Sequence, residues 1–121
     1  MLKLMKDLPD NVLGVSAEGK VSGKDYKTIL IPAIEDKLKT YKKIRFLYQL
    51  GNEFTGFEPG AIIEDTFVGM KHLAAWDRIV LVSDHKMIDI FVEFFGHMIP
   101  CEVRIFRDSD LEKAKKWITE K

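Results

Sequence analysis

The side chains able to do nucleophilic or metal chemistry are few and scattered in this chain. His72, His85 and His97 show none of the short, fixed spacings that a metal site needs. Cys101 and a histidine brought beside it by the fold could form a nucleophile and its base, but a lone cysteine at the start of a strand is more often a small buried hydrophobic residue. We therefore predict no metal site and interpret the histidines as solvated or as lying near helix caps.

Carboxylates and glycines gather between residues 51 and 65. Glu53, Glu58, Glu64 and Asp65 could pair as a general acid and base, although carboxylates before and within the first turn of a helix commonly offset the helix dipole. The glycines of this stretch match neither common phosphate-binding pattern and are typical of turns and close backbone approach. Because no catalytic constellation or cofactor motif results, we predict that the chain is not an enzyme and binds no cofactor.

Composition limits the classes of function further. Nineteen basic and nineteen acidic residues are interspersed over 121 residues, so the concentrated positive field of a nucleic-acid-binding protein is missing, and no nucleic-acid partner is predicted. The length suits a single domain over residues 1–121. A single cysteine leaves no internal disulfide, and no apolar run has the length of a signal peptide or a membrane span, so we expect a cytoplasmic location.

The elements that would position these residues begin with a predicted hairpin. Residues 2–5 and 12–17 are short apolar runs on either side of a Pro-Asp-Asn turn, which favours two antiparallel strands. Ser22 and Asp25 have the spacing of a capping box, and apolar residues then recur at helical spacing up to residue 41. Pro32 falls inside this helix, where it lacks an N–H donor, and predicts a kink or a restart.

Two nearly continuous apolar runs, residues 44–50 and 79–82, are predicted to form parallel strands at the centre of the sheet. Between them we predict a loop over residues 51–58 and a helix over residues 59–76 that opens at Pro59. Ligands and partners of open α/β sheets commonly meet the chain at such a strand-to-helix turn, so this loop is a candidate working surface. The face that the helix is expected to bury consists of Ile62, Thr66, Phe67, Met70, Leu73 and Ala74.

The next predicted helix, over residues 86–98, is unusually apolar. Ser83 and Asp84 precede it and are predicted to cap it. Its apolar arc is about twice as wide as the stripe of about 100° that packing on one sheet face covers, so part of the arc needs another cover. At 100° per residue its polar positions share one strip, which consists of Lys86, Asp89, Glu93, Gly96 and His97.

The chain ends in an alternating stretch and a last helix. Cys101, Val103 and Ile105 alternate with polar neighbours, which predicts a half-exposed strand at the edge of the sheet. A helix with a second capping-box spacing, from Ser109 to Glu112, follows. A hairpin followed by alternating helices and strands predicts one α/β sandwich.

Three segments of the sequence resemble the SpoIIAA-like family. They are residues 21–26 (VSGKDY), residues 30–35 (LIPAIE) and, most specifically, the Phe57-Glu58-Pro59-Gly60 signature within residues 56–61. That family is part of the STAS group, named for sulfate transporters and anti-sigma-factor antagonists. The resemblance covers nearly the whole chain in order. It implies a bacterial-type protein with a STAS-like sandwich, in which a mixed sheet of about five strands packs with about four helices.

The resemblance also implies a class of function. Members of the STAS group are typically non-enzymatic regulators, and anti-sigma-factor antagonists bind a partner kinase through the loop and helix after the third strand, under control of a phosphorylated serine. Here the corresponding loop has Thr55 and no serine, and we interpret Thr55 as a turn hydroxyl. The SpoIIAA-like branch is also similar in fold to CRAL-TRIO lipid-carrying domains, which implies an apolar ligand or a membrane surface.

Two hypotheses follow from these observations. In the first, the chain is a non-catalytic STAS-like binding module whose loop 51–60 and helix 86–99 hold an apolar small molecule or lipid, or associate with a membrane surface. In the second, it is a protein-interaction regulator whose partner-binding loop includes Thr55 and Glu58; a homodimer contact on the apolar helix is a further alternative. The residues predicted to face a ligand or membrane are Phe57, Ile63, Phe67, Met87, Phe91, Phe94, Phe95 and Met98.

Overall fold

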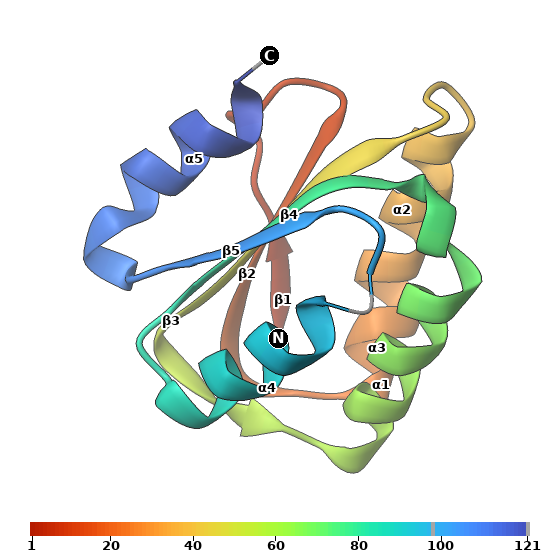
Figure 1. The fold of residues 1–121 in the computed structure, drawn as a ribbon. Helices are drawn as coiled ribbons and strands as arrows, with labels where there is room; N and C mark the ends of the chain where they lie inside the picture. Colours follow the sequence, from red (N-terminus) through yellow and green to blue (C-terminus); the bar gives the residue numbers. More distant parts are fainter. Residues whose placement is uncertain (98, 121) are drawn as a thin grey trace.

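The computed structural model describes the backbone of residues 1–97 and 99–120, and their side chains except those of residues 65–70, 87, 91, 94 and 95. Five strands form one sheet in this part of the chain, in the order β1-β2-β3-β4-β5 (Figure 1). β1 is antiparallel to β2, and every other neighbouring pair is parallel. The strands are β1 Leu2–Leu4, β2 Val12–Val21, β3 Ile44–Phe57, β4 Trp76–Ser83 and β5 Glu102–Phe106. The structure therefore confirms the predicted mixed α/β sheet with its N-terminal hairpin.

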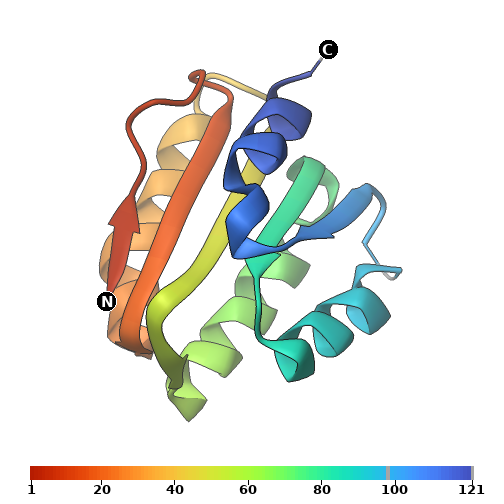
Figure 2. The same ribbon diagram turned by 90° about the vertical axis from the view of Figure 1, so that its left-hand side faces the viewer.

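Helices cover both faces of this sheet (Figures 1 and 2). One face carries a continuous helical run, composed of α1 (Gly23–Asp25), a π-helical segment (Tyr26–Leu30) and α2 (Ile31–Leu38), together with α3 (Pro59–Lys71) and α4 (Lys86–Gly96). The other face carries α5 (Leu111–Thr119), whose Trp117 and Ile118 pack against Leu47 and Val80 of the central strands. The central strands are therefore buried on both faces, as continuous apolar runs predict.

The helical run begins at the predicted capping box. The Ser22 N–H donates to Asp25 Oδ2 at 2.8 Å, and the Asp25 N–H donates back to Ser22 Oγ at 3.1 Å. Pro32 lies just after the π-helical segment, so the predicted kink takes the form of a change in helix type. A proline lacks an N–H and crowds the carbonyl four residues before it, and a locally wider helix relieves that crowding. The helix ends at Leu38, before the predicted end at residue 41.

The largest difference from the sequence prediction lies after residue 50. Residues 51–57, predicted as a loop that contains Thr55, are the second half of β3. This half pairs with the end of β2, where Gly19 faces Phe54 and Val21 faces Phe57. Phe54 is buried and its ring lies 4.9 Å from that of Phe57, so the extension has its own apolar anchor. The prediction was wrong because pairing with β2 overrides the local turn preference of Gly and Asn.

Two glycines of the paired strands, Gly19 in β2 and Gly56 in β3, have positive φ angles within a strand and not within a turn. The β2–β3 register shifts on either side of Gly19, whose φ is +59°, and Gly56 has a φ of +145°. Only glycine adopts such angles readily, and a strand uses them to absorb a bulge. Glu58 alone then separates β3 from α3, so the predicted partner-binding loop is reduced to one residue.

The helix after β3 also differs from its prediction. It ends at Lys71, and Trp76 already pairs with Ile44 as the first residue of β4. The expected buried face is wrong where it is described, because Ile62 is 52% exposed whereas its neighbour Ala61 is fully buried. The cause is a close approach of α1 and α3 through Gly23 and Gly60, which leaves room only for a small residue at the contact. Leu73 and Ala74 are also exposed, and the side chains of Thr66, Phe67 and Met70 lie outside the described residues.

Candidate functional site

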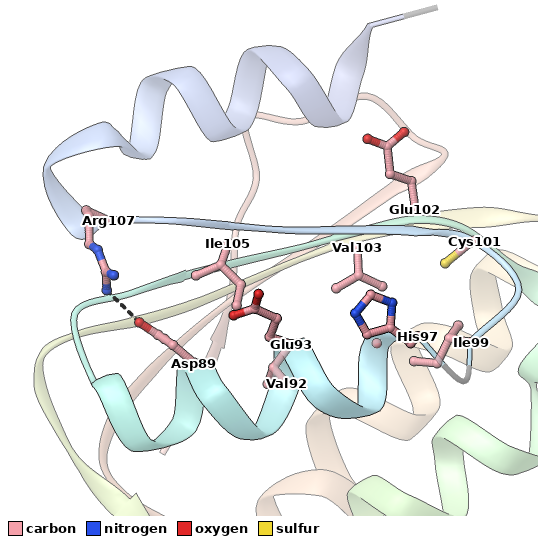
Figure 3. A pocket seen from close by; sticks show the side chains of 11 residues that line it. Asp89, Val92, Glu93, His97, Ile99, Cys101, Glu102, Val103, Ile105 and Arg107 are labelled. Atoms are coloured by element: carbon pink, nitrogen blue, oxygen red, sulfur yellow. Dashed lines mark hydrogen bonds and ion pairs between the residues drawn. The ribbon is translucent and has the colours of Figure 1, made fainter.

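A cavity of about 690 Å³ lies between α4 and β5 (Figure 3). Its volume falls within the range of roughly 300–1,000 Å³ that is usual for small-molecule sites. Glu93 of α4 and His97, the residue after α4, project toward β5, and Arg107 lies at one end of the strand. The lining residues are Asp89, Val92, Glu93, Gly96, His97, Ile99, Cys101, Glu102, Val103, Ile105 and Arg107.

Helical spacing brings the polar part of this lining together. Asp89, Glu93 and His97 follow one another at intervals of four residues, which places them on one stripe of α4. Of the polar strip predicted for this helix, all residues except Lys86 line the cavity. At the C-terminal end of the helix, a Cβ added to Gly96 would lie 3.3 Å from Val103 Cβ, so glycine lets α4 approach β5 closely there.

Asp89 is the buried polar residue of the cavity, with 6% of its surface exposed. Its Oδ2 accepts a hydrogen bond from Arg107 Nη1 at 2.5 Å, and the same nitrogen donates to the Ser83 carbonyl at 3.2 Å. Asp89 Oδ1 is buried and has no hydrogen-bond donor among the described residues. The ion pair to Arg107 thus satisfies one half of a buried carboxylate, and the other half stays without a partner in this part of the chain.

A second carboxyl with a buried oxygen that lacks a donor in the described chain, that of Asp108, lies next to Arg107, where β4 and β5 end. The Asp108 N–H donates to Asp84 Oδ1 at 3.3 Å, while Asp108 Oδ1 is buried without a donor in the described chain. Burial, and then the negative charge of Asp84, raise the pKa of Asp108. The carboxyl ends of two parallel strands therefore gather acidic groups around one arginine. The described residues include no group of three or more His, Cys, Asp or Glu side chains able to hold a metal ion.

Apart from Glu102, the remaining lining side chains are apolar or weakly reactive. Val92, Ile99 and Ile105 are half-buried and pack against the main hydrophobic core. Burial, and then the negative charge of Asp77, raise the pKa of the Cys101 thiol. A thiol that stays protonated at neutral pH is a poor nucleophile, so Cys101 adds packing to the cavity wall. These side chains are suited to holding a small molecule with an apolar part.

The structure places the predicted site residues elsewhere, as far as it describes them. Phe57 is half-buried at the end of β3, with its ring 6.3 Å from that of Tyr48. Thr55, Glu58 and Ile63 are exposed on the end of β3, in the connection and on α3. None of these four lines the cavity. The other predicted residues, Phe67, Met87, Phe91, Phe94, Phe95 and Met98, lie outside the described residues.

The two regions predicted to bind a ligand, residues 51–60 and the helix 86–99, come close to each other at one contact. The ring of Phe54, in the unpredicted half of β3, lies 5.2 Å from the ring of His85, just before α4, in an edge-to-face arrangement. The cavity residues that sequence reasoning missed are chiefly Asp89, Val103 and Arg107. The four-residue interval of the polar strip was the available signal, but it gives no indication that β5 lies opposite.

Two comparisons with known proteins found similarities. A protein-family model described as SpoIIAA-like matches residues 12–119. A solved structure of an uncharacterized protein of the DUF3478 family with a SpoIIAA-like fold, from Shewanella loihica PV-4, is similar with a TM-score of 0.77. The two chains are 21% identical, and the match covers 97% of this chain and 93% of that one. None of the curated proteins matches. At this identity the structural similarity shows the fold, and the family model extends from β2 to α5.

Proposed function

This chain belongs to the SpoIIAA-like family, and we propose that it is a non-catalytic binding module for a small molecule with an apolar part, such as a lipid, held between α4 and β5. Family and fold favour a binding or regulatory module in the coarse sense. The observation that carries the finer proposal is the cavity of about 690 Å³, because its walls combine branched apolar side chains with a few polar groups.

The apolar walls supply affinity in this proposal. Three apolar side chains of the lining, those of Val92, Val103 and Ile105, are each half-buried, so part of their apolar surface is exposed to water. A hydrocarbon group laid against them removes apolar surface from water, at a gain of about 25 cal/mol per Å². Polar groups at the same site, Asp89 and Arg107 among them, would orient the molecule.

The outer side of α4 distinguishes a cavity ligand from a membrane surface. Ile90 is 63% exposed and does not line the cavity, whereas Val92, two residues further along, does. A membrane surface would contact Ile90, and a small molecule in the cavity would contact Val92. No helix in the described part of the chain is long and apolar enough to cross a bilayer.

Native mass spectrometry of protein purified without detergent, followed by organic extraction, tests the proposal. We expect an adduct on the wild type that Val92→Asp loses and the matched Ile90→Asp variant keeps. Val103→Phe fills part of the cavity without adding a charge and should also remove the adduct. This second variant keeps the test valid if Val92→Asp does not fold. Circular dichroism checks that each variant is folded. A wild type that carries no adduct and takes up no added long-chain alcohol would contradict the proposal.

Exposed residues at the start of α3 favour a second candidate function, a protein-interaction regulator of the anti-sigma-factor-antagonist type. Ile63 is 68% exposed, and Glu58 and Thr55 are exposed just before it in the chain. Affinity purification under stringent washing tests this function. A partner retained by the wild type and by Ile90→Asp, but lost on Glu58→Lys and Ile63→Asp, supports it. A partner that all four proteins retain argues against this surface.

A further inference from the structure

β5 has one backbone edge without a partner in the described part of the chain. It is the last strand of the sheet, and its residues, Glu102–Phe106, pair with β4 alone (Figure 2). No backbone hydrogen bond joins these residues to a described loop or helix. An open edge of this kind presents N–H and C=O groups to any strand that can lie alongside it. The side chains of β5 decide which strand fits.

The charged side chains of β5 have opposite signs two residues apart. Glu102 and Arg104 share one face of the strand, and Arg104 Nε donates to Glu102 Oε2 at 2.6 Å. Both side chains stay about half exposed, at 52% for the glutamate and 50% for the arginine. The guanidinium lies 4.7 Å from the Trp117 ring, and its other N–H donors make no hydrogen bond to the described chain. The pair therefore has capacity for a second pair of charges alongside it.

Two copies of β5 supply such charges to each other in one antiparallel register. When a two-fold axis passes through Val103, Glu102 of each copy faces Arg104 of the other copy. In the same register Cys101 of each copy faces Ile105 of the other. Opposite charges directly across two strands stabilise the pairing, whereas an axis through Glu102 or Arg104 would place like charges face to face. Charges on an edge strand usually deter another strand, but here a second copy brings the matching charge for each of them.

We propose that the open edge of β5 is a self-association surface, at which a second copy of this chain adds antiparallel with the two-fold axis at Val103. The two sheets then form one continuous sheet, and association stops at a dimer because both copies use the same edge. This inference goes beyond the proposed function and needs no ligand. The paired strands are short, so the interface is small and the dimer weak, with a dissociation constant of roughly 10 μM to 1 mM.

Charge-swap variants of the full chain test the edge and its register together. Glu102→Arg and Arg104→Glu each place like charges opposite one another at two positions of the dimer. Each variant alone should therefore dimerise at least roughly tenfold more weakly than wild type. An equimolar mixture of the two should dimerise as wild type does, because every charge then faces its opposite. Sedimentation equilibrium up to roughly 1 mM protein measures the association, and circular dichroism checks that each variant is folded.

A matched control makes the same change of charge on the other open edge of the described sheet. β4 pairs with β3 only as far as Leu50, so the second half of β3 has a free edge, on which Glu53 is exposed. Glu53→Arg should leave the dimer unchanged.

Cysteine cross-linking tests the register by itself. In a Cys101→Ser background, Val103→Cys should give a disulfide-linked dimer on mild oxidation, because the two copies of this residue face each other at the axis. Ile105→Cys in the same background should give none, because its two copies lie four residues apart along the paired strands.

The outcomes are independent of the proposed function, which concerns a bound molecule. A wild type that stays monomeric up to roughly 1 mM would overturn the second copy as the occupant of this edge. A dimer that both charge variants retain, or that Glu53→Arg loses, would overturn β5 as the surface. Charge variants that weaken the dimer and are not restored by mixing would overturn the register.

Discussion

Along the helical run Gly23–Leu38, the side chains of Tyr26, Leu30 and Ile34 are each 1% exposed. The region of α4 and β5 differs, because β5 has no fully buried residue and α4 buries a carboxylate, Asp89. The first region lies over β1 and β2 and the second beside β4 and β5, at opposite ends of the same sheet (Figure 2). The first is packed like the interior of a typical domain. The second is hollow, and two of its carboxyl groups have a buried oxygen without a donor in the described chain.

This difference divides one sheet into a packed end and a hollow end. The packed end supplies stability through buried apolar area, and the hollow end forgoes part of that stability and has a cavity of about 690 Å³. Asp89 and Asp108, which both have a buried oxygen without a donor in the described chain, lie at the hollow end. Unsatisfied buried groups are rare in native proteins, and their clustering at one end supports a binding site there.

Truncation of one apolar side chain at each end should give the largest difference in the free energy of unfolding between the two ends. Leu30→Ala removes a fully buried side chain and should lower the free energy of unfolding by about 2–5 kcal/mol. Ile105→Ala removes a half-buried side chain that already faces the cavity, and it should cost roughly 1 kcal/mol. Urea denaturation measures both values. Equal costs would mean that the α4–β5 region is packed as tightly as the helical run.

The close approach of α1 and α3 gives a second test, of the tight packing itself, with a matched pair of variants. A Cβ at Gly23 would lie 3.1 Å from the Gly60 carbonyl carbon, so Gly23→Ala must push two backbones apart and should cost about 1–3 kcal/mol. A Cβ at Gly60 would lie 3.7 Å from the nearest atom, an ordinary contact. Gly60→Ala should therefore stabilise the protein slightly, by under 1 kcal/mol. Thermal denaturation of the two variants measures the asymmetry, and equal shifts in Tm would contradict the contact.

The packed end was the predictable end, because its signals are local in sequence. Ser22 and Asp25 are three residues apart, and the stripe of Tyr26, Leu30 and Ile34 repeats every four residues. A capping box and a helical stripe are each complete within a few turns of chain, so the residues alone reveal them. The family resemblance, read from residues 21–26, 30–35 and 56–61, extended this prediction to a mixed sheet of about five strands with helices packed around it.

The second half of β3 and the hollow end were not predictable, because their features depend on residues distant in the chain. Thr55 lies in a strand only because Gly19 and Val21 of β2 pair alongside. Asp89 was placed correctly on the polar strip of its helix, but its burial depends on Arg107, eighteen residues later. A periodic pattern gives the face of a helix and does not reveal which element covers that face.

The Asp89–Arg107 ion pair gives a third test, of intermediate size. Arg107→Ala leaves a buried carboxylate without its counter-charge and should destabilise the protein by about 1–2 kcal/mol, less than for a fully buried pair because the arginine is 52% exposed. Adding Asp89→Asn in that background should recover part of the loss, since an amide needs no counter-charge. Urea denaturation of the single and double variants measures this coupling. Strictly additive losses would show that the pair contributes little.

The smallest effect should come from Asp108 and should depend on pH. Burial and the charge of Asp84 raise its pKa in the folded state above the unfolded value, so the stability linked to its protonation is fully present below the unfolded pKa and is lost as the pH rises through the folded pKa. At neutral pH the ionised Asp108 therefore opposes folding, and Asp108→Asn should raise stability by roughly 0.5 kcal/mol. Differences in Tm between variant and wild type should shrink toward zero as the pH falls into the acidic range. In an Asp84→Asn background the gain should be smaller at every pH, because the asparagine oxygen still accepts the Asp108 N–H but carries no charge. A gain that is independent of pH would instead indicate that the carboxylate at the end of β5 is as well solvated as one on the packed side of the molecule.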